Sequence, residues 1–148
     1  MNSVHDKIKR QLIQVVNKII FKEKKMIVKC QGISLYPSEV HLLLVIQDDV
    51  ATNATTIAGR LGLTKGAVSQ TLSRLEKKGI ILKTKNPYNK NELTLSLTRL
   101  GKEAYAMCRS RQAVFTQAHD AYLTTLNPEQ KEVIFNFLLH METAIGIE

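Results

Sequence analysis

The hydrophobic pattern changes period at Gly79, and this change most constrains the fold of the chain. Before Gly79, Val68, Leu72 and Leu75 fall on one stripe of a helix. After it, residues 80–84 and 92–97 alternate or cluster as strands do. Thr64 is a good N-cap because its hydroxyl can accept a free backbone N–H, and glycine commonly ends a helix. The sequence therefore predicts a helix of about four turns followed by a two-stranded hairpin.

A shorter helix is expected just before this one, over residues 54–61, with Asn53 as its N-cap. Gly62 then makes a tight turn into the longer helix, and two helices joined in this way form a helix-turn-helix. The apolar residues that would pack on the longer helix are Ile57, Ala58 and Leu61. Residues 85–91 form a turn-rich, acid-free loop between the strands. We therefore predict a mainly α winged helix-turn-helix with a two-stranded wing.

The polar side of the longer helix carries small or basic residues, and its one acid, Glu76, lies at the flank. Positive charge is concentrated in the same part of the chain. Of a formal net charge of +8, residues 51–91 contribute eight Lys and Arg against Glu76 alone. Scattered lysines usually serve solubility, but their concentration on one motif favours a polyanion partner.

Several short motifs follow one another in a characteristic order over nearly the whole chain. They are Ile57-Ala58-x-Arg60-Leu61-Gly62-Leu63-Thr64, Val68-Ser69-Gln70, Leu75-Glu76-Lys77-Lys78-Gly79 and Leu97-Thr98-x-x-Gly101. In this order and spacing the chain resembles the MarR family of bacterial transcriptional regulators. The resemblance implies a cytoplasmic homodimer, more often a repressor than an activator, that binds pseudo-palindromic promoter DNA and responds to an effector.

Within this interpretation, Gln70 is the expected base reader because its amide can pair with adenine in the major groove. Lys65 and Lys77 are expected on phosphates, and Gly66 would permit close approach. The full set of expected DNA-binding residues is Thr64, Lys65, Gly66, Ser69, Gln70, Ser73, Lys77, Lys85 and Lys90.

The wing departs from the family pattern. The family's wing usually carries an Asp-x-Arg element whose arginine enters the minor groove, and the matching positions here are Asn89 and Asn91. Lys85 or Lys90 would have to supply the cation instead.

The remaining segments are expected to be helices that flank the DNA-reading unit. The apolar spacing predicts a helix from about Val4 to Lys29, and Pro37 fits the first turn of another that ends at Asp48-Asp49. Thr98 and Asn127 are the N-caps expected for two further helices. We predict one domain over residues 1–148, with a DNA-binding region at 35–98 and dimerisation helices at 1–34 and 99–148.

A zinc site is a further implication of the resemblance. In the zinc-sensing branch of the family, Glu23, His41 and Cys108 would occupy three ligand positions, and all three are suitable for zinc. The fourth position is Gln112, a poor zinc ligand, so the set is incomplete. The alternative is that His41 packs in the cleft, Cys108 is a small buried hydrophobe and Glu23 pairs with a nearby lysine. No cofactor is required by this interpretation.

Other classes of function fit the sequence less well. The two cysteines, Cys30 and Cys108, predict no disulfide framework, and Lys29 alone gives little support for a reactive thiol. No stretch approaches the ~18 apolar residues of a membrane span, and no enzyme motif is present. The rivals are an architectural or nonspecific DNA-binding protein and a winged helix used for protein contacts, whose recognition face would be apolar or acidic.

Overall fold

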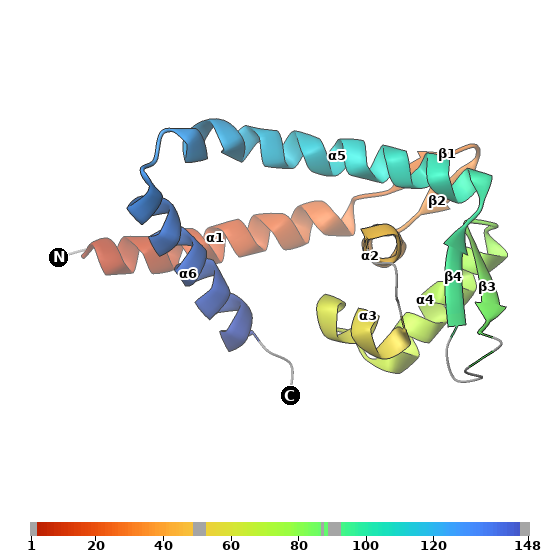
Figure 1. Cartoon of the computed structure of the whole chain (residues 1–148). Helices are drawn as coiled ribbons and strands as arrows, with labels where there is room; N and C mark the ends of the chain where they lie inside the picture. Colours follow the sequence, from red (N-terminus) through yellow and green to blue (C-terminus); the bar gives the residue numbers. More distant parts are fainter. Residues whose placement is uncertain (1–2, 49–52, 87, 89–92, 146–148) are drawn as a thin grey trace.

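The computed structural model describes residues 3–48, 53–86, 88 and 93–145. It is mainly helical, and its elements are α1 (Val4–Lys24), β1 (Val28–Cys30), β2 (Ile33–Leu35), α2 (Pro37–Asp48), α3 (Ala54–Leu61), α4 (Lys65–Lys77), β3 (Ile81–Lys85), β4 (Leu93–Leu97), α5 (Arg99–Thr124) and α6 (Pro128–Ala144). Helices α2 to α4 and the β3–β4 hairpin gather at one end, and α1 and α5 project from it toward α6 at the other (Figure 1).

The hydrophobic core lies at the winged-helix end, where α2 packs against α3, α4 and α5. Strand β1 contacts the first half of α5 and contributes to the same core. The buried apolar residues are Val28, Cys30, Leu35, Val40, Leu42, Leu43, Ile46, Ile57, Ala58, Val68, Leu72, Leu75, Ile80, Ile81, Ala104 and Cys108. The apolar stripe predicted for α4 is therefore fully buried, and its polar side is left facing outward.

The predicted helix-turn-helix and wing are confirmed. The side chain of Asn53 accepts a hydrogen bond from the Thr56 N–H (2.8 Å), and Thr64 Oγ1 accepts one from the Ala67 N–H (3.2 Å). Between the two helices, Gly62 adopts a left-handed conformation with φ of 61°. Strands β3 and β4 pair antiparallel, with residue 81 opposite residue 97.

The wing begins one residue later than predicted. The Ile80 N–H donates to the Leu75 carbonyl (2.9 Å) in the turn that ends α4, so Ile80 belongs to the helix terminus and β3 starts at Ile81. Gly79 has the expected positive φ of 69°. The predicted start of the second strand, Glu92, lies outside the described residues.

The first helix was predicted too long, because it ends at Lys24 and not at Lys29. The residues beyond it form a hairpin in which Val28 pairs with Leu35, and both side chains are buried. The central residues of its turn, Gln31 and Gly32, have positive φ of 46° and 80°, as in the tight turns that suit paired strands. The apolar spacing predicted a helix through Lys29, but burial of the two strands in the core favours the hairpin there.

The other predicted helix starts are confirmed. Pro37 is the first residue of α2, and Thr98 Oγ1 accepts a hydrogen bond from the Gly101 N–H (2.9 Å) at the start of α5. At α6, Asn127 and Gln130 form a reciprocal capping box with bonds of 2.8 and 3.0 Å.

The two terminal helices, α1 and α6, bury no side chain in the described chain, although both are rich in apolar residues. Their exposed large apolar residues are Val4, Ile8, Ile13, Val15, Val16, Ile19, Ile20, Phe21, Val133, Phe135, Phe137, Leu138 and Leu139. Across the described ranges, no helix is both long enough and apolar enough to span a lipid bilayer.

Candidate nucleic-acid interface

The outward side of α4 forms a shallow hollow, which we call the recognition face. It is lined by Gly66, Ser69, Gln70, Ser73, Arg74 and Lys77. Five of these six residues were predicted from the sequence to contact DNA. Arg74 was not, because its position at the edge of the polar side gives no signal by itself.

The first turn of α4 adds two predicted residues to one end of this face. Thr64 and Lys65 are exposed there, and the Thr64 hydroxyl is engaged in capping. The N-terminus of a helix carries partial positive charge and free backbone N–H groups, which suit an anion. A Cβ on Gly66 would meet nothing closer than Thr64 Oγ1 at 4.0 Å, so the surface beside it is open.

On the wing side, the recognition face is bounded by an ion pair. Lys83 of β3 places Nζ 2.9 Å from Glu76 Oε2 and donates to Ser73 Oγ (3.2 Å). Ser73 Oγ in turn donates to the Ser69 carbonyl (3.0 Å). Ser73 therefore has intramolecular partners, and the Glu76 carboxylate is paired.

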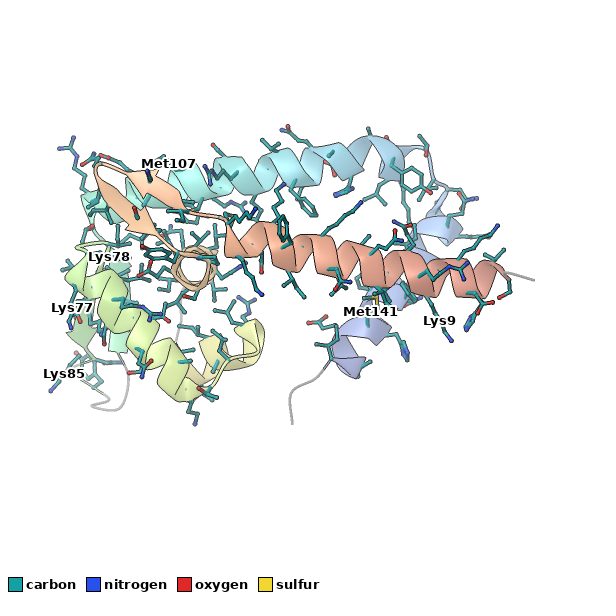
Figure 2. The ribbon with its side chains drawn as sticks, turned by 180° about the vertical axis from the view of Figure 1, so that it is seen from behind. Lys9, Lys77, Lys78, Lys85, Met107 and Met141 are labelled. Atoms are coloured by element: carbon teal, nitrogen blue, oxygen red, sulfur yellow. The ribbon has the colours of Figure 1, made fainter. Side chains whose placement is uncertain are left out.

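The described part of the wing contributes one further exposed cation at this end of the molecule. Lys85 is exposed at the end of β3, and Figure 2 shows it at the same end of the molecule as Lys77. The other predicted wing residues, Asn89, Lys90 and Asn91, lie outside the described residues.

On the α2 side, the recognition face is bounded by a network around Glu39, whose side chain is only 1% exposed. Lys78 Nζ lies 2.7 Å from each Glu39 carboxylate oxygen and also donates to the Ser34 carbonyl (2.8 Å). Arg74 Nε lies 3.8 Å from Glu39 Oε1. Lys78 is thus paired with a buried carboxylate. A buried carboxylate without a partner would destabilise the fold.

The residues expected for zinc are only partly brought together. His41 Nε2 lies 2.9 Å from Glu23 Oε1, so two of the three are in contact. Cys108 does not join them, and no group of three His, Cys, Asp or Glu side chains that could hold a metal occurs among the described residues. Cys108 is instead buried on α5, in the core shared with β1, and the Gln112 side chain accepts a hydrogen bond from Arg109 (3.1 Å).

The environment of Cys108 also bears on redox chemistry. Both Cys30 and Cys108 are free thiols in the core. Burial raises the pKa of the Cys108 thiol; nearby Arg111 lowers it to a smaller extent, and Cys30 raises it. A raised pKa keeps the thiol protonated and unreactive.

Known proteins resemble this chain in sequence and in fold. The family model described as "MarR family" matches residues 35–93. The uncharacterized HTH-type transcriptional regulator YvnA of Bacillus subtilis (strain 168) is 30% identical over 121 residues, which cover 72% of this chain and 74% of YvnA.

Two solved structures illustrate the likeness of fold. FabT of Streptococcus pneumoniae in complex with DNA has a TM-score of 0.73 and 18% identity, with coverage of 95% of this chain and 96% of FabT. The zinc-responsive regulator ZitR of Lactococcus lactis has a TM-score of 0.69 and 15% identity, with coverage of 96% and 99%. At these identities the likeness shows the fold alone. The sequence match to YvnA over most of both chains, together with the family model, shows that the chain belongs to the MarR family, a family of transcriptional regulators and not of enzymes.

Proposed function

We propose that this protein is a homodimeric, sequence-specific repressor that binds a pseudo-palindromic promoter site in the cytoplasm and is released by an effector. The observation that carries this proposal is the recognition face of α4, which is small, polar and basic. Two acids beside it are paired with lysines, Glu76 with Lys83 and Glu39 with Lys78. Such a face can approach the DNA backbone without repulsion.

The proposed dimer explains the exposed apolar surfaces of the terminal helices. Contiguous exposed apolar surface usually marks an interaction site, and a second copy of the chain is the simplest partner. We assign residues 1–34 and 99–148 to dimerisation and residues 35–98 to DNA binding. Dimeric assembly is typical of the family, and a two-fold axis would present two α4 helices to half-sites about 34 Å apart.

The proposed contact residues receive their roles from their chemistry. Gln70 reads adenine, and Ser69 bonds to a base or a phosphate. Lys65 and Lys77 bind phosphates. The other two proposed phosphate contacts are Lys85 and Lys90. Gly66 lets the helix approach closely, and the α4 terminus at Thr64 adds backbone N–H donors.

The rival is an architectural protein that binds DNA without regard to sequence. Fluorescence anisotropy separates the two, with duplex from upstream of the protein's own gene compared with a scrambled duplex over a salt series. We expect the upstream duplex to bind more tightly, because base contacts add to the phosphate contacts. In the same assay Gln70→Ala should lose about 1–3 kcal/mol more on the cognate duplex than on the scrambled duplex. Equal affinity of wild type for both duplexes would favour the rival.

Zinc is the first effector to test. The contact between Glu23 and His41 supports it, and ZitR, which has the same fold, is zinc-responsive. The assay is DNA affinity with and without added zinc, in wild type and in His41→Ala. A zinc response in wild type alone would support a site at this pair. A response that survives in His41→Ala would place the site elsewhere.

A further inference from the structure

Arg74 is an exposed side chain of the recognition face to which the proposed roles above assign no contact with DNA. It lies one turn beyond Gln70 on α4, so the two side chains are neighbours on the helix surface. Its side chain is 52% exposed, although it belongs to a network that reaches into the core. The inference below rests on the proposed function, because it adds a residue to the same DNA-binding surface.

Two contacts hold the guanidinium of Arg74. Nη2 donates to Thr71 Oγ1 (2.9 Å), and Nε lies 3.8 Å from Glu39 Oε1. The Thr71 hydroxyl is itself fixed, because it donates to the Ala67 carbonyl (2.9 Å). A guanidinium has five N–H donors in a planar fork, so the donors not used in these contacts can face outward as a pair.

Glu39 is a rigid anchor for this fork. Its carboxylate is buried, receives two contacts of 2.7 Å from Lys78 Nζ and accepts a bond from the Tyr36 N–H (2.9 Å). An anchor of this kind lowers the entropy lost when the arginine binds, which is how rigid side chains gain affinity.

We propose that Arg74 is a specificity-determining residue that reads guanine in the major groove, with Glu39 as its positioning residue. Guanine presents O6 and N7 as paired acceptors there, and a bidentate arginine is the commonest specific contact to them. With Gln70 one turn earlier, α4 would read an adenine and a nearby guanine in each half-site.

The test is a selection of bound sequences from a library of random duplexes, performed with the full-length protein. Wild type is compared with Arg74→Lys, Arg74→Ala and Glu39→Gln. Lys77→Ala is the matched control, because it removes a cation from the same face. Circular dichroism checks that each variant is folded, and Arg74→Lys keeps the charge while it removes the fork.

We expect one guanine in each half-site to be fixed in wild type and degenerate in both Arg74 variants. The discrimination lost should be about 5- to 150-fold. Glu39→Gln should weaken the same preference without changing the salt dependence, whereas Lys77→Ala should flatten the salt dependence and keep the preference. Replacement of that guanine by 7-deazaguanine, which lacks the N7 acceptor, should weaken wild type but not Arg74→Ala.

The outcomes separate this inference from the function on which it rests. A wild-type protein that enriches no sequence overturns the proposed function and this inference with it. Enriched sequences that are the same in wild type and in both Arg74 variants overturn only this inference. If the Arg74 variants lose the same affinity on every duplex and show a flatter salt dependence, Arg74 is a phosphate contact. That result would also overturn this inference.

Discussion

Lys83 on the wing places its Nζ 2.9 Å from Glu76 Oε2 on α4. Glu76 is the only acid in residues 51–91, and this contact pairs its negative charge beside the recognition face. The same ammonium donates to Ser73 Oγ, so one side chain joins β3 to two positions of α4. The contact therefore fixes the wing relative to the recognition helix.

The charge-neutral double variant Lys83→Met/Glu76→Gln tests this coupling. It should weaken binding to cognate and scrambled duplexes alike, because the wing is no longer fixed to α4. The slope of log affinity against log salt should stay unchanged, since Lys83 is already paired and releases no DNA counterion. Lys77→Ala is the control and should reduce the slope by about 0.9. An equal reduction in the double variant would instead identify Lys83 as a phosphate contact, and unchanged affinity would show that the coupling is unimportant.

Gly101→Ala should strongly destabilise the fold. A Cβ at this buried position would lie 2.0 Å from the Ile80 carbonyl oxygen, which is backbone and cannot turn aside. Overpacking of this kind costs about 1–3 kcal/mol or more. Gly59→Ala, at an exposed position of α3, is the control. A Cβ there would meet nothing within 4 Å, and the variant should gain roughly 0.5–1 kcal/mol. Urea unfolding at a fixed protein concentration measures the free energy of unfolding of both variants. Equal stability of Gly101→Ala and wild type would refute the clash.

Cys108 should react slowly with a thiol reagent such as Ellman's reagent in the native protein. Burial raises the pKa of its thiol, and the thiolate is the reactive form. Labelling should therefore remain slow near pH 8 and accelerate only at higher pH than for an ordinary exposed cysteine. In urea both thiols of the chain should react quickly. Rapid native labelling at neutral pH would reopen the redox interpretation.

Most of the DNA-binding region could be predicted because its signals are local. The caps at Asn53, Thr64 and Thr98 act on backbone within three residues, and an apolar stripe predicts the buried side of α4 and hence its outward side. Local rules of this kind need no knowledge of the tertiary structure.

The features that were missed depend on contacts between distant segments. Strands β1 and β2 have three residues each, too few to show a strand period, and their burial against α5 decides their structure. The Glu39–Lys78 pair joins residues 39 positions apart, and the contact between Arg74 and Glu39 also joins two distant segments. Cys108 aligns with a zinc-ligand position in the sequence, but its contacts with distant segments place it in the core.

Gly66→Ala should separate stability from DNA binding, because the two effects have opposite signs. In the free protein the added methyl group meets only Thr64 Oγ1 at 4.0 Å, and alanine loses less backbone entropy than glycine does in a helix, so stability should rise slightly. Against DNA, the same methyl group would occupy the space that close approach requires. Affinity should then fall by roughly 5- to 150-fold, if overpacking costs about 1–3 kcal/mol. Urea unfolding and anisotropy on the cognate duplex measure the two effects, with Gly59→Ala as the variant that should gain stability and keep its affinity. A Gly66→Ala protein that binds as tightly as wild type would show that α4 does not approach DNA at this position.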